Sequence, residues 1–154
     1  MRIVIASDHG GFKLKEVLVK YLKSKGYIIK DMGVFSEESC DYPVIGYQAA
    51  KLVGAKKFPM GVLICKTGIG MSMVGNKVRG VRAALCSSAE IARSSREHND
   101  SNVLVLGADT VSLQGAKKIL QAWLNAKRPE GRHSRRVKQI KKIEGLEYER
   151  AKKN

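Results

Sequence analysis

The chain has 154 residues, 44% of them hydrophobic, and carries 29 Lys and Arg against 14 Asp and Glu for a net charge of +15. This length and composition are typical of one globular domain with a buried core, and no apolar run approaches the ~20 residues of a membrane-spanning helix. Three cysteines without a CxxC spacing argue against a disulfide framework and a zinc site, and the N-terminal apolar run is too short for a signal peptide. We therefore expect a cytoplasmic protein.

Apolar strand-like runs and amphipathic helix-like segments alternate along the chain. Strands are expected at 2–6, 27–30, 61–64, 81–85 and 103–106. Helices are expected at 12–25, 43–53, from the turn after Cys65 to about 76, 89–97 and 113–125. In the first helix the apolar side chains recur at i, i+3, i+4, i+7 and i+8, and Gly26 ends it.

This alternation predicts an α/β fold, specifically a single-domain, Rossmann-like three-layer α/β/α sandwich with a parallel five-stranded sheet. Ligands of such folds bind beyond the carboxyl ends of the strands. Asp8 and His9 follow the first strand, and Cys65 to Thr67 follow the third. We expect both groups, with the residues after Leu106, at one edge of the sheet.

The C-terminal segment differs in character, because eleven Lys and Arg stand against four Glu between Lys127 and Asn154. A helix is expected at about 134–148, followed by a basic tail to residue 154. Its apolar residues recur every third position and form a narrow seam, namely Val137, Ile140, Ile143 and Leu146. Such a seam favours packing on a partner subunit, and thus a homodimer, although a helix folded back on its own domain remains open.

The basic charge raises the alternative of nucleic-acid binding. Aromatic residues make up only 6% of the chain, and no recognition motif interleaves them with the basic residues. A solvated basic face with a few phosphate-binding arginines explains the charge at least as well. We do not expect nucleic acid or a membrane as a partner.

The segment from Ile64 to Gly70 carries the strongest indication of chemistry. A buried strand ends on Cys65, and a glycine-bearing turn then leads into a short helix. Backbone N–H groups at a helix start stabilise negative charge and favour a thiolate over a thiol. This pattern indicates a reactive cysteine beside an anion site, with a buried inert cysteine as the alternative.

Three further groups are candidates for function. Asp8 and His9 precede two glycines that allow a ligand to approach, although the alternative is a capped turn and the dinucleotide motif GxGxxG is absent. His98 suits acid–base work as a histidine, unless it is a loop histidine without a role. Arg132 and Arg136 stand one helical turn apart, where both can hold a phosphate or simply face solvent.

Together these motifs resemble the family that contains ribose-5-phosphate isomerase type B and the galactose-6-phosphate isomerase subunits. They occur in the family's order between residues 2 and about 145. The matching segments are SDHGGF (7–12), CDYP (40–43), ICKTGIGMS (64–72), NK (76–77), RA (82–83), SREHND (95–100), AWL (122–124) and GRH (131–133).

The resemblance implies an aldose–ketose isomerase that uses no metal and no organic cofactor. Cys65 would be the base that moves a proton from C2 to C1 of the sugar through an enediolate, and the amides of residues 66–70 would face the oxyanion. His98 would assist opening of the furanose ring, with Thr67 and Asp8 or His9 near the ring oxygen and hydroxyls. The implied substrate-binding residues are Asp8, His9, Tyr42, Lys66, Gly68, Ile69, Gly70 and Asn99, and the implied phosphate-binding residues are Arg132 and Arg136. The site would lie between two subunits.

Two residues depart from the family pattern. Lys66 stands where the family usually has glycine after the cysteine, which would strain the turn if that position needs a positive φ. Asp109 stands where many members carry an arginine that contacts the substrate phosphate, and an aspartate there repels phosphate. The substrate is expected to be ribose 5-phosphate. A six-carbon sugar phosphate (galactose or allose 6-phosphate), a non-catalytic phosphosugar-binding protein, and pairing of dimers into tetramers remain open.

Overall fold

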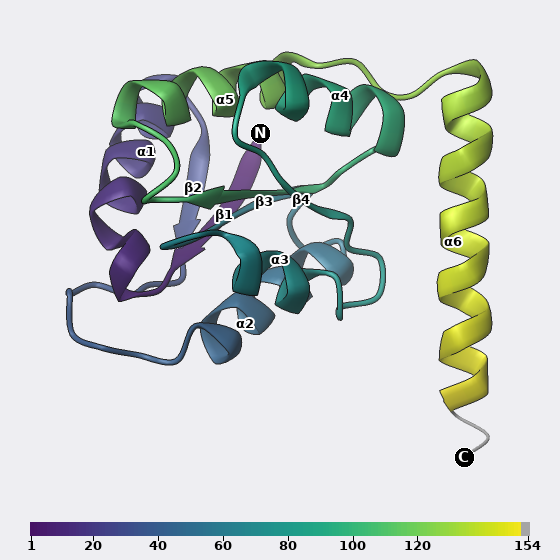
Figure 1. Ribbon diagram of the computed structural model, residues 1–154, viewed down its shortest axis with the longest axis horizontal. Helices are drawn as coiled ribbons and strands as arrows, with labels where there is room; N and C mark the ends of the chain where they lie inside the picture. The colour runs from purple at the N-terminus through teal and green to yellow at the C-terminus, as the bar shows by residue number, and fades with distance from the viewer. Residues whose placement is uncertain (152–154) are drawn as a thin grey trace.

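The computed structural model describes residues 1–151, which form a five-stranded sheet with helices on both faces (Figure 1). All neighbouring strands are parallel, and their order is β2-β1-β3-β5-β4. The strands are β1 (Arg2–Ser7), β2 (Ile28–Asp31), β3 (Met60–Cys65), β4 (Ala83–Leu85) and β5 (Val103–Gly107). This confirms the predicted parallel sheet, with each strand within two residues of its expected bounds.

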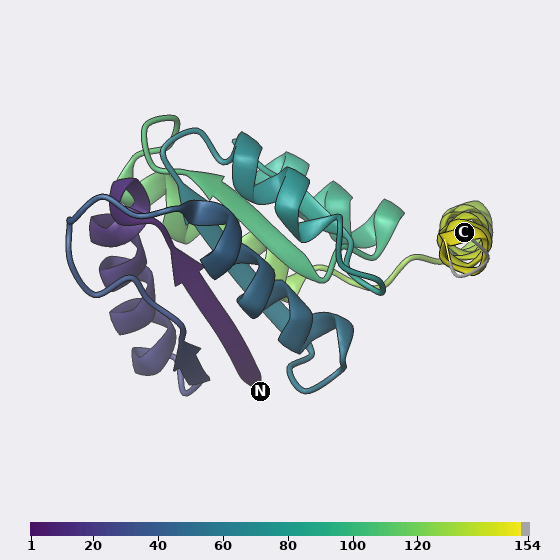
Figure 2. The same ribbon diagram turned by 90° about the horizontal axis from the view of Figure 1, so that it is seen from below.

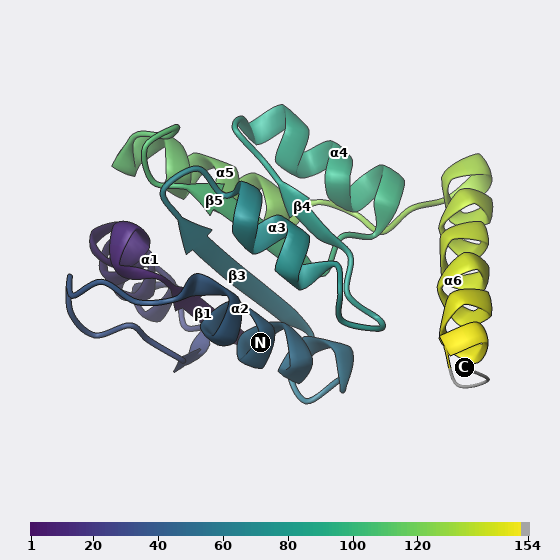
Figure 3. The same cartoon turned by 60° about the horizontal axis from the view of Figure 1, so that its bottom comes forward.

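Two helical layers enclose the sheet, with α1, α4 and α5 on one face and α2 and α3 on the other (Figure 3). The helices are α1 (Phe12–Ser24), α2 (Tyr42–Gly54), α3 (Ile69–Gly75), α4 (Ala89–Asn99), α5 (Leu113–Asn125) and α6 (Gly131–Ala151), and a short 3-10 helix covers His9–Gly11. The predicted three-layer sandwich is therefore confirmed.

The core divides along the pleat of the strands. Ile5, Val62 and Leu104 face α1, α4 and α5, where Trp123 is fully buried and its Nε1–H donates to Ser101 Oγ at 2.8 Å. The alternate strand residues face α2 and α3 instead, and Cys65 is among them. Burial on both faces explains why the central strands read as continuous apolar runs.

The sheet changes direction of winding between β1 and β3. The chain adds β2 on one side of β1 and the remaining strands on the far side of β3, so these two strands flank the topological switch point. The Asp8 N–H donates to the Ile64 carbonyl at 3.2 Å and joins the two strands where they end. Ligands of open α/β sheets bind at this position.

Helix α6 stands at the side of the domain, beyond the α4 end of the sheet (Figures 1 and 2). It begins three residues before the expected helix and ends three residues after it, and residues 152–154 of the expected basic tail lie outside the described residues. Lys141 Nζ lies 3.9 Å from Asp100 Oδ2, and the Gly80 N–H donates to Glu144 Oε1 at 2.7 Å. One edge of α6 thus folds back on its own domain.

The apolar seam of α6 is partly buried against its own domain and partly exposed. Val137 is buried within its own chain, whereas Ile140, Ile143 and Leu146 are 42–61% exposed. The packing of this seam on a partner subunit stays a prediction. Within residues 1–151, no helix is both long enough and apolar enough to cross a membrane.

Replacement of Leu104 by alanine tests the account of the core. Leu104 is fully buried on the inner strand β5, so Leu104→Ala is expected to lower the free energy of unfolding by about 2–5 kcal/mol in a urea titration. The half-exposed Leu113 provides the same substitution as a control, with an expected change within about 0.5 kcal/mol. Equal losses of stability in the two variants would contradict the assignment of Leu104 to the core and of Leu113 to the surface.

Candidate active site

A pocket of about 440 Å³ opens at the carboxyl ends of β1 and β3, at the switch point of the sheet. Nine residues line it: Asp8, His9, Tyr42, Cys65, Lys66, Thr67, Ile69, Gly70 and Met73. Eight of these were expected at the site from the sequence. They come from three separate stretches of the chain, which the parallel sheet brings to one edge.

Cys65 forms the floor of this pocket and is only 5% exposed. The Gly68 N–H donates to Cys65 Sγ at 3.1 Å across the turn that precedes α3. A backbone N–H directed at sulfur favours the negatively charged thiolate. The turn takes this shape because Gly68 adopts a left-handed backbone conformation with φ of 79°.

Some backbone N–H groups of the turn donate to side chains of the turn itself. Besides the Gly68 N–H on Cys65, the Ile69 N–H donates to Thr67 Oγ1 at 3.3 Å. Two of the five amides expected to face an oxyanion are therefore engaged within the turn itself. Their bonds hold the Cys65 sulfur and the Thr67 hydroxyl in fixed positions at the start of α3.

Asp8 and His9 face the cysteine from the end of β1. The buried Asp8 carboxylate accepts the Gly11 N–H at 2.9 Å and caps the 3-10 helix, so the capped turn considered from the sequence is present. The Cys40 N–H donates to His9 Nδ1 at 3.3 Å. In the neutral ring this bond puts the proton on Nε2, where it can be donated to a ligand oxygen.

The wall opposite β1 is formed by Tyr42, the first residue of α2. Its ring lies so close to Gly70 that a Cβ at Gly70 would come within 2.6 Å of two ring carbons. Glycine at position 70 therefore allows α2 to close over the start of α3. This close approach gives Tyr42 its place in the pocket.

The two departures from the family pattern are neighbours in space. Among the described non-glycine residues, only Lys56 and Asp100 have a positive φ. Lys66 therefore does not strain the backbone of the turn. The Lys66 stem packs on Gly10, where a side chain would collide with it. The Asp109 N–H donates to the Lys66 carbonyl at 2.9 Å and brings an exposed acid beside the exposed lysine.

The other predicted residues lie at the opposite edge of the sheet. Helix α4 starts beyond the carboxyl end of β4 and returns, so His98 and Asn99 arrive near the amino end of β5. The adjacent Asp100 binds Arg82, the residue before β4, at 2.8 Å. Strands of this length span roughly 17–20 Å, so His98 and Cys65 of one chain cannot hold the same small molecule.

The start of α6 joins this second group. The rings of His98 and His133 stack with centroids 4.1 Å apart, which places Arg132 and Arg136 near the end of α4. Partial burial lowers the pKa of His133 below its ordinary value, and the nearby charges of His98, Arg132 and Arg136 lower it further. The cluster therefore carries a positive potential suited to an anion.

The three cysteines differ in their surroundings, and no disulfide joins them. Burial raises the pKa of the Cys86 thiol, which keeps that residue protonated and inert. Cys40 lies at the rim, with Sγ 3.8 Å from His9 Nδ1. No group of three or more His, Cys, Asp and Glu within residues 1–151 is arranged to hold a metal ion.

Comparison with known proteins assigns this architecture to a family. The family model described as Ribose/Galactose Isomerase matches residues 3–140. The chain belongs to the ribose/galactose isomerase family. Ribose-5-phosphate isomerase B of Escherichia coli strain K12 is 43% identical over 143 residues, which are 93% of this chain and 96% of that protein.

Solved structures of the ribose/galactose isomerase family have the same fold. Ribose-5-phosphate isomerase B of Clostridium thermocellum superposes with a TM-score of 0.92 at 45% identity, covering 95% of this chain and 99% of that one. The enzyme from Mycoplasma genitalium with bound ribulose-5-phosphate superposes with a TM-score of 0.89 at 38% identity, covering 94% and 96%.

Two contributors to these sites were not expected from the sequence. Met73 lines the Cys65 pocket because it follows Ile69 by one helical turn in α3. His133 stacks on His98, although the two are far apart in the sequence. Helical spacing is a signal for Met73, whereas nothing local predicts the histidine pair.

The Gly68 turn allows a matched test, because Gly26 has nearly the same φ, 80° against 79°. A Cβ at Gly26 meets nothing within 4 Å, whereas one at Gly68 would meet the Leu85 side chain and lie 3.1 Å from the Gly107 nitrogen. Gly26→Ala is expected to cost about 1–2 kcal/mol from backbone strain alone. Gly68→Ala should lower the free energy of unfolding by clearly more than Gly26→Ala does. Equal losses in the two variants would contradict the close packing of Gly68 against Leu85 and Gly107.

Proposed function

We propose that the chain is an isomerase that interconverts ribose 5-phosphate and ribulose 5-phosphate, with Cys65 as its base. The observation that carries this proposal is the pocket in which Cys65, Thr67, Asp8 and His9 meet at the switch point of the sheet. The likeness to ribose-5-phosphate isomerase B over nearly the whole chain supports the same reading. Residues 1–154 form one isomerase domain in this proposal, and the reaction needs no metal or organic cofactor.

The chemistry follows from the groups in the pocket. The Cys65 thiolate removes the proton from C2 of the open-chain aldose and returns it to C1, while a proton passes from O2 to O1. Between these steps the enediolate carries negative charge beside the turn at the start of α3, where backbone dipoles stabilise it. Thr67 and His9 hold the hydroxyl groups, and Lys66, Ile69 and Gly70 form the walls with Tyr42.

The two unusual residues fit this chemistry as a pair. The family pattern has glycine and arginine where this chain has Lys66 and Asp109, and the two positions are joined by a backbone hydrogen bond. Lys66 thus places a cation in the turn that neighbours Asp109. Lys66 offsets the repulsion that Asp109 alone would exert on an anionic substrate.

The remaining site residues reach the pocket from a second copy of the chain. None of these four residues lines the Cys65 pocket of its own chain: His98 and Asn99 lie at the end of α4, and Arg132 and Arg136 at the start of α6. A two-fold axis would bring this end of one protomer to the carboxyl edge of the other. His98 then assists ring opening, Asn99 holds the sugar, and the two arginines bind the phosphate.

Exposed apolar side chains are available for such a dimer. Ile140, Ile143 and Leu146 of α6 form one uncovered strip, and Val44, Tyr47 and Met73 are exposed on α2 and α3 beside the Cys65 pocket. Burial of one strip against the other would stabilise the pair and complete both sites. We place this homodimer in the cytoplasm, where free cysteines such as Cys65 stay reduced.

The reaction is tested by following conversion of ribose 5-phosphate to ribulose 5-phosphate. Cys65→Ala removes the base and is expected to reduce kcat by at least about 10²–10⁴-fold. Cys86→Ala, which removes the buried thiol of raised pKa, is expected to retain most of the activity. A fully active Cys65→Ala would contradict the role of this thiol. Turnover of allose or galactose 6-phosphate alone would reassign the substrate, and no turnover at all would indicate a binding protein.

The dimer is tested by introducing charge into the exposed seam. Ile143→Lys places an ammonium in the proposed interface, so sedimentation velocity should show monomers and isomerase activity should fall with dissociation. Ile28→Lys changes a similarly exposed isoleucine, 64% against 60%, on the edge strand β2, and should leave the dimer intact. Dimers that persist with Ile143→Lys, or a wild-type protein that is monomeric, would contradict this interface.

A further inference from the structure

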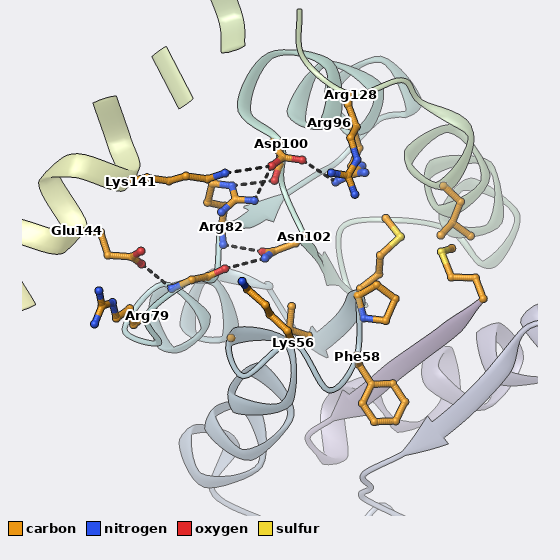
Figure 4. Close-up of a pocket in the computed structure, with 17 residues that line it drawn as sticks. Lys56, Phe58, Arg79, Arg82, Arg96, Asp100, Asn102, Arg128, Lys141 and Glu144 are labelled. Atoms are coloured by element: carbon orange, nitrogen blue, oxygen red, sulfur yellow. Dashed lines mark hydrogen bonds and ion pairs between the residues drawn. The ribbon is translucent and has the colours of Figure 1, made fainter. Parts of the chain in front are cut away.

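A second cavity lies at the amino edge of the sheet, away from the Cys65 pocket. It has a volume of about 710 Å³ and lies between α6 and the body of the domain (Figure 4). Lys141 and Glu144 close it from α6, while Arg82 and Asp100 belong to the domain side. This volume is within the range of sites for small organic ligands, about 300–1,000 Å³.

The cavity carries a large excess of positive charge. Six basic residues line it, namely Lys56, Arg79, Arg82, Arg96, Arg128 and Lys141, against the two acids Asp100 and Glu144. Asp100 is shared by three of the cations, Arg82 at 2.8 Å, Arg96 at 3.5 Å and Lys141 at 3.9 Å. The Glu144 carboxylate accepts the Gly80 N–H. The acids therefore leave most of this charge unbalanced.

Arg96 is the deepest of these cations and is only 9% exposed. Its Nη1–H donates to the Ser101 carbonyl, and its guanidinium lies 5.7 Å from the centre of the Trp123 ring. The Arg96 Nε atom is buried without a hydrogen-bond partner among residues 1–151. A buried guanidinium is costly unless its charge is balanced, and Asp100 balances Arg96 only in part because it also pairs with Arg82 and Lys141.

Arg128 adds a second guanidinium beside Arg96 (Figure 4). Burial lowers the pKa of Arg96, Asp100 raises it, and the like charges of Arg128 and Arg82 lower it further. Arg128 has no ion pair with an acid within the described residues. Two neighbouring guanidinium groups form a fork that suits the oxygens of a phosphate.

We propose that this cavity is a second ligand site, which binds a small molecule carrying two or more linked phosphates on an apolar body. One phosphate monoester carries a charge of about −1.5 to −2, so about two phosphates are needed to balance an excess of four positive charges. Phe58, Met60 and Leu124 line the same cavity and provide a surface for the apolar body. Arg96 and Arg128 bind the phosphates, with Lys56 at the rim.

This site is separate from the one that binds the sugar phosphate. The Cys65 pocket lies at the carboxyl ends of the strands, while the cavity lies at their amino ends, on the same edge as His98 and Asn99. None of its lining residues is shared with the Cys65 pocket or with the group formed by His98, Asn99, Arg132 and Arg136. The proposal therefore stands whether or not the chain is an isomerase.

Trp123 provides a built-in reporter, because it is the chain's one tryptophan and lies against Arg96. Titration of the intact protein with inorganic tripolyphosphate should change its fluorescence in a saturable manner. Lys56→Gln combined with Arg128→Gln should weaken binding by at least about tenfold, which corresponds to 1.4 kcal/mol. The control, Lys20→Gln combined with Lys23→Gln, removes the same charge from exposed positions of α1 and should bind within about twofold of wild type.

Two results would overturn this site. The first is the absence of a saturable change in fluorescence. The second is an equal loss of affinity in the control variant, which would show attraction by net surface charge alone.

Calorimetry with pyrophosphate and with ADP tests whether the apolar lining contributes to binding, because ADP adds an organic group to the same two phosphates. ADP should bind more tightly, and equal affinities would contradict the role of Phe58 and Leu124.

Discussion

The structure depends on one topological constraint, which is the change of winding direction between the neighbouring parallel strands β1 and β3. Because the loops after these strands turn away from each other, their carboxyl ends are left uncovered and form a crevice. Asp8, His9 and Cys65 enter this crevice from the two strand ends. The same parallel arrangement sends the helices that connect strands back to the amino edge, and α4 therefore carries His98 away from the cysteine of its own chain.

Separation of the two groups is the structural reason for proposing a dimer. One edge of the sheet holds the thiol and the turn that stabilises negative charge, and the other holds the histidine and arginines suited to sugar and phosphate. In the proposed mechanism, neither edge is a complete site by itself. A dimer that joins the unlike edges of two chains would form two complete sites, and the exposed seam of α6 supplies apolar surface for that contact.

Much of this arrangement could be predicted from local patterns. Apolar runs and helical periodicity identified the five strands and six α-helices of the described residues. The central strands were recognisable because burial on both faces requires continuous apolar residues, as at 61–64 and 103–106. The Cys65 turn was recognisable from its glycines. Contacts between distant residues left no such record: the stacking of His98 on His133, the hydrogen bond between Asp109 and Lys66, and the cation-lined cavity behind α6 required the folded chain.

We propose that each active site takes Cys65 from one chain and His98 from the other. Cys65→Ala and His98→Ala chains, each inactive alone, can be co-expressed with different affinity tags and purified through both tags. Such a heterodimer has one site with both lesions and one with neither, so its isomerase activity should be about half that of the wild type. If Cys65 and His98 acted within one chain, every site would carry a lesion, and an inactive heterodimer would contradict the account.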